Sequence, residues 1–326
     1  MESACATIAG ALAAVGEAVD GAEIHLAEGD WTLPDTGDAF HNETRWLTIR
    51  SAEGVAPESV RSTGVDGPGD GGGLHVKLVR LSDLAVVGSL GKAVAGGFED
   101  YLWIDRSEVY SRNPDAIELG DCFQIQGEGG VYTGVYVTDV HMDNMCNGPS
   151  NTTLARNVYA ERTAAAHASG SATVVNYTVE FVYGSTYMPG WPDYHGDVYQ
   201  MYQRAEDIVI YGARNVPDAF ISSRGIVGSS DPVRDVAMDH VELDIDGWVF
   251  SYCAPAGGPT IEHMIIQDSR FVGSSNWCGE APGSPEVDPN GIVDVLIANS
   301  VFENGSPEQV PQPWELPGIR YEPPLD

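Results

Sequence analysis

The sequence predicts a right-handed parallel β-helix, a solenoid built from three-walled coils, and three observations support this fold class. An apolar pattern at positions i, i+2, i+5 and i+7 recurs along the chain. Its copies begin 23 to 39 residues apart, which are periods typical of a repeat architecture. A third short strand, opened by an aspartate, lies between several of the copies. The predicted class is therefore all-β.

Each copy of the pattern is interpreted as two strands and a bend. Two apolar residues at i and i+2 face inward with the two-residue period of a strand, and the shift to i+5 marks a bend of one or two residues. Serine takes the i+5 place in some copies. The copies begin at Val79, Leu102, Val135, Val236, Met264 and Val295, with weaker ones at Val174 and Ile208. Eight copies predict about eight coils.

The third wall of the coil is predicted from segments of the form Asp-x-aromatic. They begin at Asp121, Asp197, Asp218 and Asp246. No helical period of ten or more residues separates the strands, so an alternating β-α-β architecture is excluded.

The two ends of the chain predict the domain organisation. Residues 1–20 are expected to form a capping helix, because Ile8, Leu12, Val15 and Val19 mark one apolar face that would cover the open end of the solenoid. Residues 21–305 form the β-helix. Residues 306–326 form a Pro-rich tail, with Trp314 and Tyr321 as expected packing anchors.

Composition excludes several classes of protein. The formal net charge is −32, so nucleic acid is not an expected partner. No apolar run of 18 residues exists, so no membrane span is predicted. The five cysteines have no zinc-site spacing. Either two disulfides, Cys122 with Cys146 and Cys253 with Cys278, or reduced buried thiols agree with the sequence.

Several short segments resemble the pectate-lyase-like superfamily of parallel β-helices. DGAEIHLAEGDW, residues 20–31, resembles the first strand that follows the capping helix in that superfamily. YLWIDRSEVYS, residues 101–111, is similar to the WIDH strand of pectate lyases, with Arg106 in place of histidine. DYHGDVYQ and PDAFISS, which contain Asp197 and Asp218, resemble other coils of β-helix proteins. The calcium aspartates of pectate lyases and the paired aspartates of polygalacturonases are not recognisable. The resemblance implies a carbohydrate polymer as ligand.

The candidate catalytic residues gather on the third wall. Asp197, Asp218 and Asp246 are expected to form a column across coils spaced by about 4.8 Å, where like charges raise one another's pKa and could bind a metal ion. His195, Tyr199 and Arg224 add a base and a cation nearby. The same aspartates could equally cap backbone amides of a repeated turn.

The candidate substrate-binding residues come from an aromatic loop and its surroundings. Residues 183–194 hold aromatic rings among Gly and Pro, which suit the C–H faces of sugars or anchor the loop on the solenoid. The predicted contacts are Trp191, Tyr194, Gln200, Arg204, Trp248 and Tyr252.

The functional prediction is an extracellular, carbohydrate-active protein. The favoured hypothesis is a polysaccharide lyase that cleaves a uronic-acid polymer by β-elimination, with Ca²⁺ or Arg224 neutralising the uronate and His195 or Tyr199 removing the C5 proton. One alternative is a glycoside hydrolase that uses Asp197 and Asp218 as acid and base. Another is a non-catalytic carbohydrate-binding or structural solenoid. Ca²⁺ is the only cofactor considered, a polysaccharide or oligosaccharide is the expected partner, and a secreted or cell-surface location is inferred from these predictions.

Overall fold

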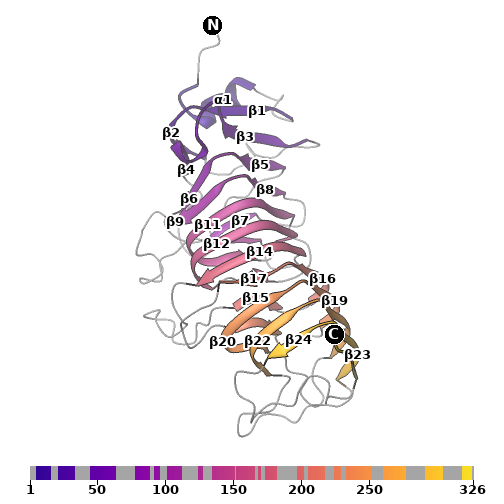
Figure 1. Ribbon diagram of the computed structural model, residues 1–326. Coiled ribbons are helices and arrows are strands. Elements are labelled where there is room, and N and C mark those ends of the chain that lie inside the picture. The colour runs from indigo at the N-terminus through magenta and orange to yellow at the C-terminus, as the bar shows by residue number, and fades with distance from the viewer. Residues whose placement is uncertain are drawn as a thin grey trace.

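The computed structural model is an elongated stack of parallel strands with a short helix at the N-terminal end (Figure 1). The structure describes residues 5–15, 21–33, 45–63, 78–88, 92–95, 101–111, 124–127, 134–150, 152–165, 168–169, 173–181, 197–201, 205–216, 224–228, 233–251, 260–276, 291–303 and 318–324. Every strand pairing in this part of the chain is parallel, and successive coils lie on one another as a β-helix requires. The predicted fold class is confirmed.

Wall A carries the first strand of each predicted pattern. Its strands, in stacking order, are β1 (Glu23–Leu26), β3 (Leu47–Ser51), β5 (Val79–Ser82), β8 (Leu102–Asp105), the first part of β11 (Val135–Ser150), the first part of β12 (Leu154–Ala165), the first part of β14 (Thr173–Phe181), β16 (Ala205–Tyr211), β19 (Val233–Asp239), β21 (Ile261–Gln267), β23 (Ile292–Ala298) and β25 (Ile319–Glu322).

Wall B follows wall A after a sharp bend. Its strands are β2 (Gly29–Thr32), β4 (Val60–Thr63), β6 (Ala85–Gly88), β9 (Glu108–Ser111), the middle parts of β11 and β12, the end of β14, β17 (Arg214–Asn215), the start of β20 (Glu242–Ser251), the start of β22 (Arg270–Asn276) and β24 (Val301–Glu303). A one-turn 3₁₀ helix, Pro57–Ser59, precedes β4.

Wall C closes the coil. Its strands are β7 (Lys92–Ala95), β10 (Gln124–Gly127), the ends of β11 and β12, β13 (Ala168–Ser169), β15 (Asp197–Met201), β18 (Arg224–Gly228) and the ends of β20 and β22. These include strands predicted after Asp121, from Asp197 and after Asp246.

The core lies inside the three walls and is made by the predicted pattern. Val79, Leu81, Leu84 and Val86 are fully buried, and the same four places are buried in the coils that begin at Leu102, Val135, Val236 and Met264. Removing these side chains from water is the main favourable term of folding. The rings of Phe271 and Phe302 also stack at the same place in neighbouring coils, with centroids 4.8 Å apart.

Serine at the i+5 place satisfies the backbone at the bend. The Ser269 hydroxyl donates to the Gln267 carbonyl at 2.7 Å and accepts from the Val241 amide of the preceding coil at 3.1 Å. Ser300 makes the equivalent pair of bonds with Ala298 and Ser269. A buried hydroxyl is tolerated in the core because both of its bonding directions are used.

The corner between walls A and B, called the A–B corner, places one residue per coil in the left-handed region. These residues are Asp83, Arg106, Asp139, Asn157, Asn176, Gly212, His240, Asp268 and Asn299, all with φ between 45° and 64°. Asp, Asn and Gly tolerate this conformation better than other residues. Asn157 Nδ2 donates to Asp139 Oδ1 at 2.8 Å, and Asn176 Nδ2 donates to Asn157 Oδ1 at 3.0 Å. A ladder of side-chain hydrogen bonds therefore runs along this part of the corner.

The two ends of the solenoid differ in how far the predictions extend. Helix α1 (Ile8–Val15) lies at the first coil and buries Ile8 and Leu12 in the core, as predicted. At the other end, β25 adds a strand to wall A within the predicted tail, and Tyr321 packs against the core. No helix in the described ranges is long and apolar enough to span a bilayer.

The repeat count missed coils. Strand β12 forms a complete A–B turn between the copies at Val135 and Val174, where a single coil with a loop was predicted. Its inward residues are Ala155, Val158 and Ala160. The small alanines do not stand out in an apolar pattern. Strands β1, β3 and β25 also belong to wall A, so the stack is longer than eight coils.

Candidate functional site

The predicted aspartate column on wall C is not what the strand register contains. Asp197 of β15 is aligned with Arg224 of β18, and Arg224 is aligned with Trp248 of β20. Asp246 therefore lies two residues before the aligned position, and Arg224 takes the place expected for an aspartate. Asp218 itself lies outside the described residues, so its place in the predicted column stays a prediction.

The other residues predicted for wall C are placed only in part. Tyr199 is 1% exposed and belongs to the buried apolar cluster, so a polymer in solvent does not reach it, and it is removed from the catalytic candidates. Gln200 lies on β15, aligned with Val227. The remaining candidates lie outside the described residues: Trp191, Tyr194, His195, Arg204, Asp218 and Tyr252.

The two predicted disulfides stay predictions. Cys122, Cys253 and Cys278 lie outside the described residues, and the side chain of Cys146 is not described.

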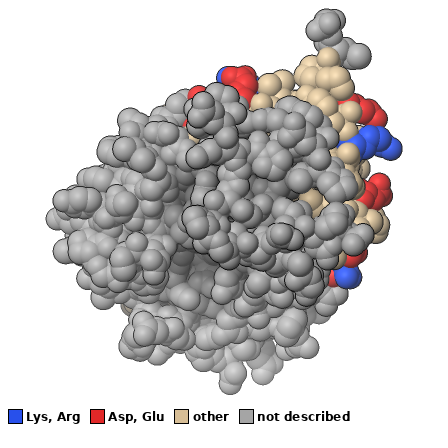
Figure 2. Space-filling model, turned by 90° about the horizontal axis from the view of Figure 1, so that it is seen from below, with Lys and Arg blue, Asp and Glu red and all other residues tan. Residues whose placement is uncertain are grey.

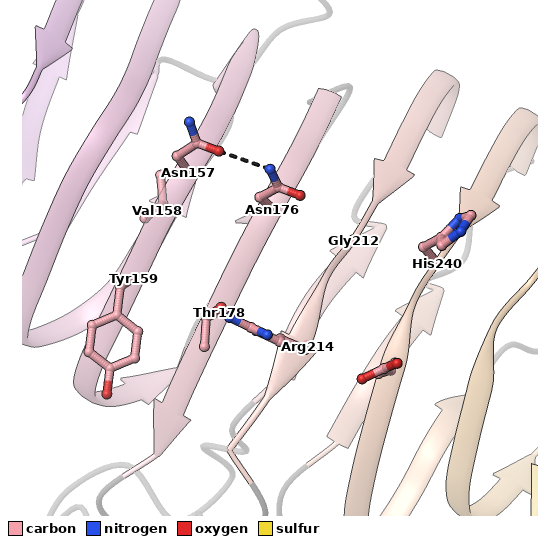
Figure 3. Close-up of a pocket in the computed structure, with 9 residues that line it drawn as sticks. Asn157, Val158, Tyr159, Asn176, Thr178, Gly212, Arg214 and His240 are labelled. Carbon is pink, nitrogen blue, oxygen red and sulfur yellow. Dashed lines mark hydrogen bonds between the residues drawn. The ribbon is translucent and has the colours of Figure 1, made fainter.

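A groove with described side chains lies on a different face, where wall B meets the A–B corner. It has a volume of about 470 Å³ and is open to solvent on one side. That volume is within the usual range for small-molecule sites. Figure 3 shows its lining, which comes from four neighbouring coils: Asn157, Val158, Tyr159, Asn176, Thr178, Gly212, Arg214, His240 and Glu242.

The row of corner side chains is interrupted at the groove. Gly212 follows Asn176 and precedes His240 along the corner, and it has no side chain to continue the ladder (Figure 3). A Cβ atom on Gly212 would lie 2.8 Å from Asn176 Oδ1. Glycine at φ +64° is thus required by both the backbone and the close approach. Asn176 therefore packs against the backbone of Gly212 at the groove.

The strand below the gap is also cut short. β17 has only two residues, and the second of them, the buried Asn215, bonds to β20 through its side chain. Its Nδ2 donates to the Asp244 carbonyl at 2.7 Å, and its Oδ1 accepts from the Asp244 amide at 2.8 Å. This side chain extends the contact with β20 beyond the single aligned pair of Arg214 with Glu242.

One side of the groove is aromatic. The Tyr159 ring stacks on His141 of the preceding coil, with centroids 5.4 Å apart and planes 20° from parallel. His141 Nε2 lies 3.0 Å from Glu161 Oε2. The Glu161–His141 pair therefore supports the position of the Tyr159 ring at the groove.

The centre of the groove is polar and charged. Thr178, Arg214 and Glu242 occupy the same position on adjacent strands of wall B. Arg214 Nε donates to Thr178 Oγ1 at 2.9 Å, which fixes the inner end of the guanidinium. Glu242 contributes to the raised pKa of Arg270, after the hydrogen bond from Arg270 to Glu303, which is the largest cause. The groove thus offers donors and acceptors a few ångströms apart.

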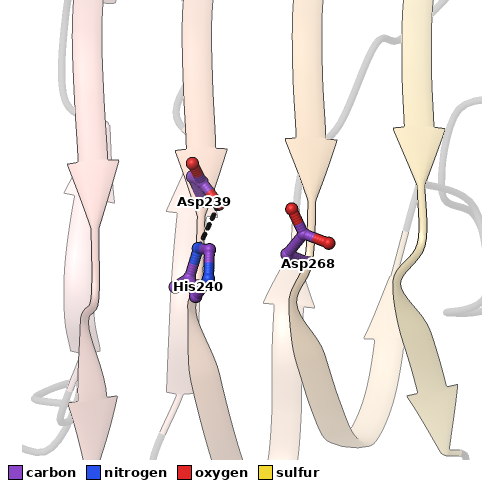
Figure 4. Close-up of side chains that lie close together, drawn as sticks. All are labelled: Asp239, His240 and Asp268. Atoms are coloured by element: carbon purple, nitrogen blue, oxygen red, sulfur yellow. Dashed lines mark hydrogen bonds and ion pairs between the residues drawn. The ribbon is translucent and has the colours of Figure 1, made fainter.

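One group of side chains beside the groove has a composition suited to a metal ion. Asp239, His240 and Asp268 place one ligand atom each within 4.8 Å of the others (Figure 4). Each carboxylate already has protein donors: Asp239 accepts from His240 and from Gln267 Nε2 at 2.9 Å, and Asp268 accepts from Asn299. Imidazole with two carboxylates would suit a transition-metal ion better than Ca²⁺, which prefers an all-oxygen set.

Most arginines of the described chain lie near a carboxylate, and several of these pairs join neighbouring coils. Arg234 lies between Glu206 and Glu262, at 3.7 and 3.2 Å, and Arg270 binds Glu303 at 2.9 Å. In the view from below, blue and red side chains lie side by side along one edge of the molecule (Figure 2). Such ladders reduce the repulsion that a net charge of −32 would otherwise cause between coils.

The sequence analysis did not find the groove. Its residues are spread over four coils, and none lies in a recognised motif. The available signal was the row of left-handed residues: once the coils are aligned, Gly212 is the one position in the row from Asp139 to Asn299 without a side chain. The missed coil at Leu154–Ala165 hid that alignment.

No protein-family model matches the chain, and no curated protein matches it in sequence. Among solved structures, it is similar to the catalytic domain of a GH87 alpha-1,3-glucanase in complex with nigerose, and to a variant of that domain with the same ligand. Both are 12% identical and are covered over 67% of their length by 98% of this chain, with TM-scores of 0.34 and 0.37.

Proposed function

We propose that this protein is a carbohydrate-active β-helix that binds a saccharide in the groove of wall B. The observation that carries the proposal is the combination of one aromatic ring with several polar side chains, Asn176, Thr178, Arg214 and Glu242, in a single open groove of about 470 Å³. A pyranose has C–H faces that pack on aromatic rings and a rim of hydroxyls that need donors and acceptors.

The length of the groove supports a ligand of more than one sugar unit. Its lining runs from Tyr159 on β12 to Glu242 on β20, across three strand-to-strand steps. At about 4.8 Å per step this is roughly 14 Å. The open side of the groove would let the rest of a polymer continue along wall B.

Cleavage of the polymer is proposed for wall C, with β-elimination preferred. The alignment of Asp197 with Arg224 supports this choice, because elimination next to a uronate needs a cation for the carboxylate and a base for the C5 proton. A hydrolase with Asp197 and Asp218 as its acid and base remains the alternative, and Asp218 lies outside the described residues. His195 remains a proposed base, and Ca²⁺ remains a proposed alternative to Arg224.

Binding is tested by titrating a panel of neutral and uronic oligosaccharides into the full chain by calorimetry. The wild type should bind at least one class, and Tyr159→Ala should weaken that binding by about fivefold or more, the loss expected for about 1 kcal/mol. Tyr101→Ala is the matched control, because Tyr101 is 38% exposed on wall A, away from the groove. Equal loss in both variants, or no binding by the wild type, would refute the proposal.

Catalysis is tested separately on polysaccharides by reading unsaturated uronide absorbance and new reducing ends in parallel. A lyase gives both signals together, whereas a hydrolase gives reducing ends alone. Arg224→Gln should abolish the absorbance without lowering the melting temperature. Binding without any product would leave a non-catalytic carbohydrate-binding module as the function.

A further inference from the structure

We infer that the groove of wall B selects a carboxylate-bearing sugar, a uronate, and that Arg214 is the residue that binds its carboxylate. This deepens the proposed saccharide binding and rests on it. It assigns a new anchoring residue on a face of the solenoid other than wall C, which carries the proposed chemistry.

Arg214 differs from most other described arginines in having no carboxylate partner among the described residues. In the described part of the chain, Arg50, Arg61, Arg80, Arg106, Arg234 and Arg270 each have a carboxylate oxygen at ion-pair distance. The Nε of Arg214 donates to Thr178 Oγ1, and no carboxylate of the described residues lies at ion-pair distance from this guanidinium. In a protein with 48 acidic and 16 basic residues, an arginine without a carboxylate is the exception.

The guanidinium of Arg214 is held by Thr178 in a way that suits a carboxylate ligand. The bond from Arg214 Nε to Thr178 leaves the two terminal nitrogens of the guanidinium for a ligand. Two parallel N–H donors match the two oxygens of a carboxylate, and this match is the reason arginine is favoured in such sites. Because the inner nitrogen is already held, little side-chain entropy remains to be lost when the ligand binds.

Glu242 is the acidic residue next to Arg214 in the groove. Glu242 lines the same groove and follows Arg214 on the next strand, yet it makes no ion pair with Arg214. Glu242 is then available to accept a hydroxyl of the sugar, while its charge still weakens the binding of an anion by a small amount.

The net charge of the protein acts against a uronate at long range only. At physiological ionic strength charges are screened over about 8 Å, so the adjacent guanidinium dominates inside the groove. Selection by Arg214 therefore predicts tighter binding of a uronate than of the neutral sugar with the same linkage, whatever the affinity for either.

The test is calorimetry on the full chain at physiological salt with trisaccharides in matched pairs. Each uronate trisaccharide, of galacturonate, glucuronate or mannuronate, is compared with the neutral trisaccharide of the same linkage, and with a sulfated neutral one. We expect at least one uronate to bind about five- to tenfold more tightly than its neutral partner, the range for a partly exposed ion pair.

Arg214→Gln should remove this preference, so that the variant binds the uronate and its neutral partner equally. Glu242→Gln should increase the preference for the uronate over its neutral partner. Arg156→Gln is the control, because it removes the same charge from an exposed arginine on the other side of the corner, where Arg156 pairs with Asp139 at 3.9 Å. It should preserve the preference.

The outcomes separate the two claims. If no trisaccharide binds the wild type, both the proposed function and this inference are refuted. Equal binding of neutral and uronate ligands, unaffected by Arg214→Gln, would retain saccharide binding and refute the inference. Sulfated and uronic ligands binding equally well through Arg214 would refute selection of a carboxylate.

Discussion

Gly212 lies directly against Asn176 at the A–B corner, so close that a single added carbon would lie 2.8 Å from Asn176 Oδ1. The two residues occupy the same position in neighbouring coils, one continuing the ladder and the other ending it. Both residues line the groove of wall B, so a larger residue at 212 would have to displace the Asn176 side chain there.

Gly212→Ala should both destabilise the protein and close the groove. Alanine at φ +64° costs about 1–2 kcal/mol for the left-handed backbone alone, and the contact with Asn176 adds to it. Gly54→Ala is a matched control, since Gly54 has φ +80° with nothing within 4 Å of the added carbon. Urea unfolding should show a larger loss at 212 than at 54, with saccharide binding lost only at 212. Equal losses would contradict the role given to the contact.

The ladder itself can be separated into backbone and hydrogen-bond contributions at Asn157. This residue donates to Asp139 and accepts from Asn176, at φ +52°. Asn157→Gly keeps the backbone conformation and loses both bonds, whereas Asn157→Ala loses the bonds and adds the backbone cost. We expect a loss of about 0.5–1.5 kcal/mol for glycine and a further 1 kcal/mol or so for alanine. A glycine variant as stable as the wild type would mean that the ladder does not contribute.

Tyr177 carries a buried hydroxyl without a hydrogen-bond partner in the described structure. Its side chain is 0% exposed, and burial raises the pKa of the phenol well above its ordinary value. Tyr177→Phe removes an unsatisfied polar group and should stabilise the protein by about 1 kcal/mol. Tyr101→Phe, at an exposed hydroxyl, should change stability by less than about 0.5 kcal/mol. Destabilisation by Tyr177→Phe would indicate that the hydroxyl is bonded in solution.

Acid should weaken the corner at Asp83. The Arg106 guanidinium, which donates to both carboxylate oxygens, holds the pKa of Asp83 below its ordinary value of 3.8, against the opposing effect of burial. A lowered native pKa stabilises the fold at pH values above 3.8 and loses that contribution as the pH falls through the native pKa.

The expected size of this contribution is about 0.5–1 kcal/mol, because the pair is largely screened by solvent. Asp83→Asn should therefore be less stable than the wild type at pH 6, with the difference shrinking at pH 3. Arg106→Gln should lose more stability than Asp83→Asn in denaturant titrations, because Arg106 also donates to Asp105 and Ser82, and the double variant should show little added loss beyond Arg106→Gln. A difference that grows on acidification would reverse the sign and contradict the assignment.

The fold could be predicted from sequence because its signal repeats. Apolar residues such as Val79, Leu81 and Leu84 must face one core in every coil, so each copy supports the others. The signal failed at Ala155 and Ala160, which are fully buried yet too small to mark a strand. It also failed for β25, whose strand is embedded in a Pro-rich segment.

The candidate site was harder to predict because it depends on register. Counting from Asp218 placed an aspartate beside Asp197, whereas strand pairing places Arg224 there. A shift of a few residues is invisible in a pattern of period two but changes which side chains are neighbours across coils. The residues that line the groove come from four coils and form no motif in the sequence, so the groove could not be predicted from it.

The most direct test of saccharide binding in the wall B groove is a crystal structure of the full chain soaked with the tightest-binding trisaccharide from the panel. We predict sugar density between Tyr159 and Glu242, with the carboxylate of a uronate on the guanidinium of Arg214. Sugar bound elsewhere with this groove empty would contradict the account.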